Sequence, residues 1–159
     1  MTSSATDKCH VFIFRRDLRV DDNLGLLQLC SRERRGKLKV LPVFVLCAEQ
    51  ADARFNRYHS QRAVDFMMGA LADLQRVLPS LVVLHGHNEL DGLRTISHRV
   101  GTVTFNEDVT PYARKRDDAL REWCASSGIP CYWCTSEYCL LANDSGMKPY
   151  TWSSQVWKH

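Results

Sequence analysis

Asn106, Glu107 and Asp108 are an amide and two carboxylates in a row, and they follow directly on the apolar run of residues 103–105. Side chains of these types can hold a polar ligand through hydrogen bonds when they lie together at the end of a strand. A purely structural alternative is that Asp108 caps the next helix while the other two are solvated, because carboxylates near helix N-termini are common for stability alone. Both interpretations remain open at this point.

The residues that follow place this set at the start of a helix. Thr110 is followed directly by Pro111, a pair that is typical of a helix N-cap and the first helical position. Residues 106–111 are therefore expected to form a strand-to-helix turn at the carboxyl end of a strand. In open α/β sheets, ligands bind at that edge.

Apolar runs that are typical of strands alternate with helix-like patterns through most of the chain. Strands are expected at residues 9–14, 40–46, 81–84, 103–105 and 129–133, and helices at residues 22–36, 63–78, 90–100 and 111–128. Gly36, Gly101 and Gly128 are expected to end three of these helices. In the second helix, apolar side chains recur every three or four positions, so this face, including Met67 and Met68, is expected to fill core.

Strands that alternate with helices predict an α/β fold, here a Rossmann-like doubly wound five-stranded parallel sheet with helices on both faces. The default strand order is 3-2-1-4-5. The winding then reverses between strands one and four, so the loops that follow them, residues 15–23 and 106–111, face each other across the ligand-binding crevice. We expect arginine–carboxylate pairs to join these loops and the remaining polar groups to be available to a ligand.

The amino-acid composition and net charge favour some kinds of protein and argue against others. The formal net charge of +3 is too small to indicate nucleic-acid binding, and 45% hydrophobic with 25% charged residues is typical of a globular domain. No apolar run is long enough to span a membrane, and the N-terminus lacks the apolar core of a signal peptide. Seven cysteines, scattered through expected strands and helices, favour reduced thiols in an intracellular protein.

Metal-binding and catalytic motifs are weak. Cys131 and Cys134 have C-x-x-C spacing, but a zinc site needs a second pair or a histidine knuckle, so free thiols are the favoured interpretation. His85 and His87 could share a metal, but no third ligand has an obvious position. There is no glycine-rich dinucleotide turn, phosphate loop, nucleophile elbow or catalytic triad. The residues favour a binding module without a metal over a reaction centre.

Three motifs resemble signatures of the photolyase/cryptochrome flavoproteins. Residues 14–23, FRRDLRVDDN, resemble the opening signature of that family. Residues 106–112, NEDVTPY, followed by Arg116 and Asp117, resemble the second, and residues 146–150, GMKPY, resemble the start of the interdomain segment. The double arginine and the DLR-x-x-DN pattern are most like cyclobutane pyrimidine dimer photolyases.

The resemblance implies a division of the chain. Residues 1–8 are expected to be a flexible leader, residues 9–137 the α/β domain and residues 138–159 the start of a linker. In the family this linker leads to a larger helical domain that binds FAD and damaged DNA, which would lie outside this chain. Residues 153–157 depart from the family pattern, so the path into such a domain is left open.

The resemblance also implies a function. The full-length protein would be a deoxyribodipyrimidine photo-lyase, a carbon–carbon lyase that repairs pyrimidine dimers with light. This domain would bind an antenna chromophore that passes excitation to FAD, and the fragment alone would be inactive. Damaged DNA would be bound by the helical domain. We expect a monomer without a membrane partner, inside the cell, in the nucleus if the source is eukaryotic and otherwise in the cytoplasm.

Antenna chromophores in this family are a reduced folate, such as methenyltetrahydrofolate, or a deazaflavin. By resemblance, Asn106 and Glu107 would bind the pterin of a folate, whose edge presents N–H donors that a carboxylate accepts side by side. Deazaflavin-binding members use the crevice near the positions of Arg16 and Asp108. No catalytic residue is expected in this chain.

Two alternatives remain. The same domain occurs in signalling cryptochromes, which are photoreceptors without repair activity. An adenine-nucleotide-binding α/β domain outside the family is also conceivable, although it would need a phosphate-holding turn that the sequence does not show.

Overall fold

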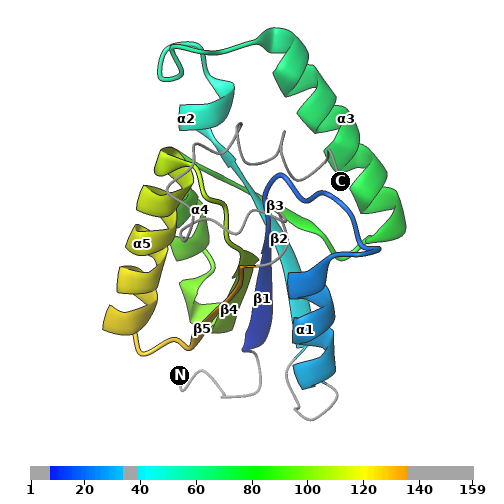
Figure 1. Cartoon of the computed structure of the whole chain (residues 1–159), viewed down its shortest axis with the longest axis vertical. Helices are drawn as coiled ribbons and strands as arrows, with labels where there is room; N and C mark the ends of the chain where they lie inside the picture. The colour runs from blue at the N-terminus through cyan, green and yellow to red at the C-terminus, as the bar shows by residue number, and fades with distance from the viewer. Residues whose placement is uncertain (1–7, 34–38, 136–159) are drawn as a thin grey trace, which may run out of the picture.

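The computed structural model describes residues 8–33 and 39–135 (Figure 1). The strands are β1 (Cys9–Phe14), β2 (Lys39–Cys47), β3 (Val82–Gly86), β4 (Val100–Asn106) and β5 (Cys131–Cys134). The helices are α1 (Leu24–Glu33), α2 (Ala48–Ala51), α3 (Gln61–Val77), α4 (Glu89–Arg94), the 3-10 turn η2 (Ser97–Arg99) and α5 (Pro111–Ser126). The expected leader and linker lie almost wholly outside the described residues.

The five strands form one parallel sheet in the order β3-β2-β1-β4-β5, which confirms the predicted doubly wound fold. Two apolar layers cover the sheet. Phe12 and Phe14 of β1 point into the layer under α1 and α3, whereas Val11 and Ile13 point into the layer under α4 and α5. This alternation follows from the two-residue period of a strand that is buried on both faces.

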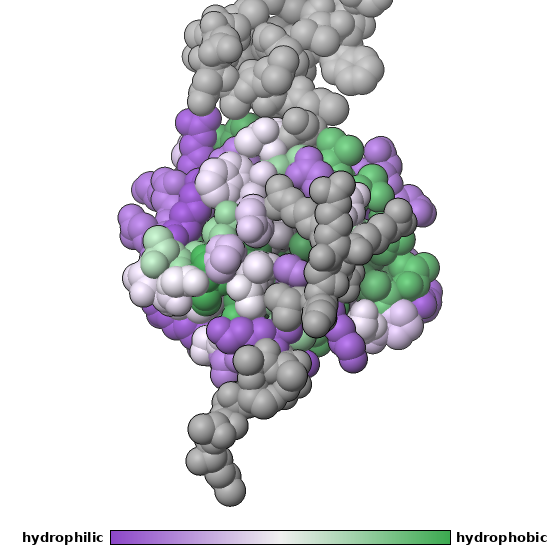
Figure 2. Space-filling view, turned by 90° about the horizontal axis from the view of Figure 1, so that it is seen from below, coloured by the Kyte–Doolittle hydropathy of each residue, from purple (hydrophilic) through white to green (hydrophobic). Residues whose placement is uncertain are grey.

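The two edges of the sheet, at the amino-terminal and carboxyl ends of the strands, present different parts of the chain. The amino-terminal edge is the face seen in Figure 2, where hydrophilic side chains lie along much of the visible outline. The loops after β1 and β4 lie at the carboxyl edge, at the top of the sheet in Figure 1. Thr110 caps α5 there, since its side chain accepts the N–H of Ala113. The predicted strand-to-helix turn is thus confirmed.

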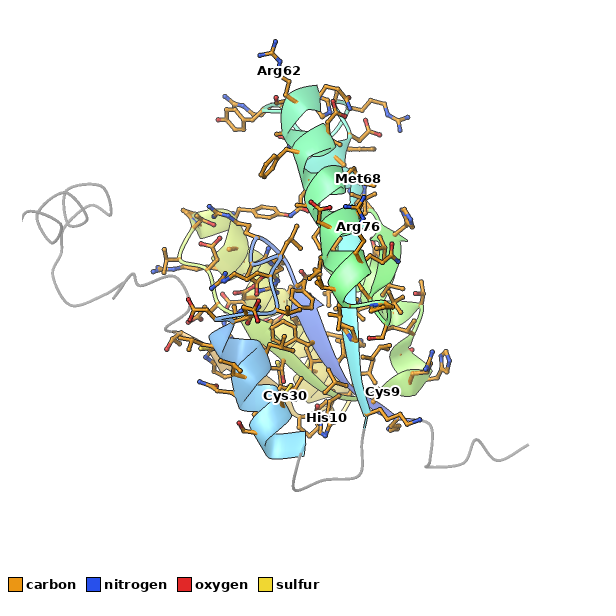
Figure 3. The ribbon with its side chains drawn as sticks, turned by 90° about the vertical axis from the view of Figure 1, so that its right-hand side faces the viewer. Cys9, His10, Cys30, Arg62, Met68 and Arg76 are labelled. Carbon is orange, nitrogen blue, oxygen red and sulfur yellow. The ribbon has the colours of Figure 1, made fainter. Side chains whose placement is uncertain are left out.

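Helix α3 follows only in part the prediction that its apolar face fills core. Met67 packs against the core cluster under α1 and α3, as predicted. Only Leu71 and Leu74 of this helix are buried, while Phe66 is 80% and Met68 45% exposed. At 17 residues α3 is about 26 Å long, whereas the five residues of β3 span about 17 Å. The helix runs back along the sheet and cannot be covered over its whole length. Its N-terminal half, Gln61 to Ala70, therefore extends beyond the carboxyl edge, with Arg62 near its end (Figure 3).

Three further differences are local. The helix expected at residues 90–100 is shorter than predicted. A capping box between Asn88 and Asp91 starts α4 at Glu89, but the helix ends at Arg94. Gly101 does not end that helix but lies within β4. The short helix α2 has no counterpart in the prediction. No described helix is long and apolar enough to cross a bilayer.

Candidate functional site

A buried arginine joins the elements at the carboxyl edge. Arg15, at the end of β1, is 7% exposed, and it donates to both carboxylate oxygens of Glu89 at 2.7 and 2.9 Å. Its Nη1 lies 2.9 Å from Oδ1 of Asp117 and donates to the backbone oxygen of Asn106 at 3.2 Å. One guanidinium therefore connects β1, β4, α4 and α5.

Burial and charge act against each other in this network. Burial opposes the charged form of Arg15, but the carboxylates of Glu89 and Asp117 leave its pKa raised. Burial likewise opposes the charge of Glu89, and the Arg15 guanidinium still holds the pKa of this carboxyl below its usual value. For Asp117 burial prevails and raises the pKa, in keeping with a buried Oδ2 atom that has no hydrogen-bond partner among the described residues.

Asn106 belongs to this structural network. It is 1% exposed, and its amide group donates to Asp17 Oδ2 at 2.5 Å and to Asn23 Oδ1 at 2.9 Å. Both hydrogens of the amide are thus used within the loop that follows β1. A pterin contact through Asn106 stays a prediction, and in this conformation the side chain offers no exposed polar atom for it.

Glu107 points away from Asn106 and toward α5 and β5. Its Oε1 accepts from Nη2 of Arg121 at 2.5 Å, and the same guanidinium lies 4.4 Å from the centre of the Trp133 ring. The Glu107 side chain is 29% exposed, so part of it is open to solvent. Its predicted role in folate binding also stays a prediction, and such binding would compete with Arg121.

Arg16 and Asp108 form a pair across the crevice. Nη1 of Arg16 donates to Oδ2 of Asp108 at 2.9 Å, and Asp108 Oδ1 accepts the N–H of Thr110 at 3.2 Å. The Arg16 side chain is 70% exposed, whereas that of Asp108 is 10% exposed. The predicted arginine–carboxylate contact between the two loops is therefore present, and Asp108 also helps to cap α5.

The Arg16–Asp108 pair lies on the rim of a cavity of about 510 Å³ at the carboxyl ends of β1 and β2. This volume is in the range of about 300–1,000 Å³ that is usual for small-molecule sites. The strand ends contribute Phe14, Phe44 and Val45, the overhanging part of α3 contributes Ala63, Phe66, Met67 and Ala70, and α5 contributes Tyr112, Ala113 and Arg116. An apolar slot with a few polar groups on its rim suits a planar aromatic ligand.

The ionisable groups of the cavity are not poised for covalent chemistry. Burial and the nearby carboxylates raise the pKa of the Cys47 thiol to about 12, so it stays protonated and unreactive at neutral pH. Burial and the Glu49 charge likewise raise the pKa of Tyr112 to about 12. Residues 8–33 and 39–135 contain no group of three potential metal ligands. The arrangement can bind and orient a ligand.

Sequence reasoning missed two functional features of this site. Glu89, the main partner of Arg15, was not singled out, although its position beside Asn88 and Asp91 in a capping box marks the start of a helix. Phe66 belongs to the apolar face of residues 63–78 that was expected to fill core, because the period of an apolar stripe does not distinguish a face that packs on the sheet from one that lines a cavity.

Comparisons with known proteins show which family the chain is similar to. The sequence model of the DNA photolyase family matches residues 10–159. The chain is 29% identical to a (6-4) DNA photolyase of Oryza sativa, of which it spans 31%, over 97% of its own length. It is 26% identical to Cryptochrome-1 of Anopheles gambiae, with 77% of this chain and 24% of that protein covered. It thus spans less than a third of these relatives.

Solved structures show the same domain. The archaeal photolyase from Sulfolobus tokodaii superposes with a TM-score of 0.66 at 35% identity, covering 77% of this chain and 28% of that one. A cryptochrome from Synechocystis, at 16% identity, shares the fold with a TM-score of 0.67 over 79% of this chain and 27% of its own. With a family match over nearly the whole sequence and the expected sheet in place, this chain belongs to the DNA photolyase family.

Proposed function

We propose that this domain binds an antenna chromophore, in the 510 Å³ cavity between α3 and α5, for a light-driven DNA-repair flavoprotein. The observation that carries the proposal is the overhang of α3, which holds Phe66 beside the cavity although its ring is 80% exposed. The chromophore would absorb light and pass excitation to FAD in a helical domain beyond this chain. That domain, and not this one, would bind the damaged DNA.

Within this proposal a flavin or deazaflavin fits the residues better than a folate. The cavity brings aromatic side chains together with the Arg16–Asp108 pair, which can bind the polar edge of a tricyclic ring. The alternative folate contacts are less accessible, because Asn106 is buried and Glu107 pairs with Arg121. The Sulfolobus tokodaii relative is described with two FAD molecules and an implied novel light-harvesting cofactor, which supports a flavin at a second site in the family.

The test is to titrate the chain with riboflavin, a deazaflavin and methenyltetrahydrofolate and to follow absorbance and fluorescence. Asp108→Asn should weaken binding of the tricyclic ligands about tenfold, because it removes the charge that orders Arg16. Glu107→Gln serves as the matched control and should leave tricyclic binding unchanged. If instead folate binds and Glu107→Gln weakens it, the folate site is correct. If no ligand binds to the chain or to a full-length protein, the antenna proposal fails.

A signalling photoreceptor is the second candidate, since the relatives include cryptochromes as similar to this chain as the photolyases are. The two candidates share the domain described above. A dimer-repair assay on the full-length protein under blue light separates them. Repair supports the photolyase, whereas photoreduction of the flavin without repair supports signalling.

A further inference from the structure

A pair of cysteines joins the end of α5 to the start of β5. Cys124, in the last turn of α5, is 1% exposed, and Cys131 is the first residue of β5. The chain reverses direction over residues 125–130, where the N–H of Ile129 donates to the carbonyl oxygen of Cys124 at 2.8 Å. Gly128, with a φ of 65°, supplies the left-handed residue that this turn requires. The turn brings the two cysteine side chains into one apolar cluster, where their thiols interact directly.

The C-x-x-C spacing of Cys131 and Cys134 does not make these two residues a pair. Side chains three positions apart on a strand point to opposite faces of the sheet. The thiol of Cys134 accordingly lies on the α1 side, where Nε2 of Gln28 donates to its sulfur atom at 3.7 Å. Cys131 lies on the α5 side and packs against the cluster that contains Cys124. The thiol with which Cys131 can react is therefore that of Cys124.

The two thiols differ in their access to solvent and in their acidity. Cys124 is buried, whereas Cys131 is only half-buried. The hydrogen bond with Cys124 and the positive charge of Arg121 lower the pKa of Cys131, whereas the same bond and burial raise the pKa of Cys124. A partly exposed thiol beside a guanidinium is the kind that reacts with oxidants. Its buried neighbour is placed to react in a second step.

We propose that Cys124 and Cys131 are an oxidative modification site, a thiol pair that hydrogen peroxide converts to a disulfide. The Cys131 thiolate attacks one peroxide oxygen, the O–O bond breaks, and Cys131 becomes a sulfenic acid. The other oxygen leaves as water with the proton that Cys131 has lost. Cys124 then attacks the sulfenic sulfur, the S–O bond breaks, and a second water leaves with the thiol proton of Cys124. The pair loses two electrons and two protons, and the peroxide is reduced to water.

The disulfide lies beside the contacts that hold α5 against the sheet. Arg121, one turn before Cys124, bonds to Glu107, and its guanidinium lies 4.4 Å from the centre of the Trp133 ring. Strand β5 is the shortest strand of the described sheet and pairs with β4 at its edge. Oxidation therefore ties this edge strand covalently to the helix that covers it.

The experiment treats the reduced 159-residue chain with a small excess of hydrogen peroxide, digests it with chymotrypsin without reduction and measures the peptide masses. Cleavage after Trp123 and Tyr132 releases residues 124–132, which contain Cys124 and Cys131 and no other cysteine. This peptide is expected to lose the mass of two hydrogen atoms. The midpoint of thermal unfolding should rise by about 5 °C, because a cross-link restricts the unfolded chain, and dithiothreitol should reverse the rise.

Three variants separate the pair from the other thiols. Cys131→Ser should abolish both the mass change and the rise in the unfolding midpoint. Cys30→Ser is the matched control, because Cys30 is an exposed thiol on α1, and it should leave both effects in place. Cys124→Ala removes the thiol of the second step, so Cys131 should stop at the sulfenic acid and become labelled by dimedone.

Two outcomes would overturn the proposal. One is an unchanged mass of residues 124–132 at a peroxide concentration that oxidises Cys30, and the other is a disulfide between Cys131 and Cys134. Neither outcome affects the antenna proposal, because Cys124 and Cys131 do not line the 510 Å³ cavity.

Discussion

Arg15 and Glu89 form a two-point ion pair, at 2.7 and 2.9 Å, although they are 74 positions apart and both are at most 7% exposed. A pair this deeply buried loses most of its hydration, which offsets much of the attraction between the charges. Its main effect is therefore on position. It fixes the start of α4 against the end of β1, and both side chains line the cavity of about 510 Å³.

Removing one charge of the Arg15–Glu89 pair should destabilise the fold. Glu89→Gln leaves the Arg15 guanidinium buried with less compensation, and we expect the free energy of unfolding to fall by about 3 kcal/mol. Urea denaturation followed by circular dichroism measures the change. The control is Glu122→Gln on the exposed surface of α5, which should stay within about 0.5 kcal/mol of the original chain. A loss below about 1 kcal/mol for Glu89→Gln would show that the fold does not depend on the Arg15–Glu89 pair for its stability.

The lowered pKa of Glu89 predicts that the free energy of unfolding depends on pH. The pKa of Glu89 lies below its ordinary value of 4.5 in the folded chain, so its contribution is fully present above that value. It is lost as the pH falls through the lower folded pKa. Unfolding free energies measured from about pH 5 to about pH 3 should therefore fall more steeply for the original chain than for Glu89→Gln. If the unfolding free energies of the two chains fell equally over this pH range, the lowered pKa of Glu89 would be contradicted.

Two glycines in helices should respond in opposite directions to substitution by alanine. A Cβ at Gly25 would lie 2.2 Å from the buried Oδ1 of Asn106, so Gly25→Ala should destabilise the fold by about 1–3 kcal/mol. A Cβ at Gly69 would meet nothing within 4 Å, and Gly69→Ala should stabilise α3 by about 0.5–1 kcal/mol. Thermal denaturation of both variants checks the pair. Stabilisation by Gly25→Ala would mean that Asn106 moves easily.

The sheet could be predicted from the sequence because its signals are local. Alternation of apolar runs with helical patterns predicted the strand order, and the Thr110-Pro111 pair predicted the start of α5. The contact between the loops after β1 and β4 then followed from topology alone. Arg16 and Asp108 do meet there.

The finer arrangement of the site could not be predicted in the same way. Asn106, Glu107 and Asp108 are consecutive, yet they lie in three different surroundings, because side chains at a strand end point to alternate sides before the chain turns. The Arg15–Glu89 pair has no local pattern at all, since it depends on how α4 packs. The exposure of Phe66 depends on the length of α3 relative to the strands beside it.

Phe66 provides the sharpest test of why α3 extends past the sheet. If the overhang serves the cavity, Phe66→Gln should change the free energy of unfolding by less than about 0.5 kcal/mol, since the ring is already 80% exposed. The same variant should weaken binding of riboflavin by about twofold to tenfold, because stacking against an aromatic ring contributes about 0.5–1.5 kcal/mol. Leu74→Ala, in the packed half of the same helix, should cost about 2–5 kcal/mol of stability. Riboflavin affinity that is unchanged in Phe66→Gln would exclude the overhang from the site, whatever else binds there.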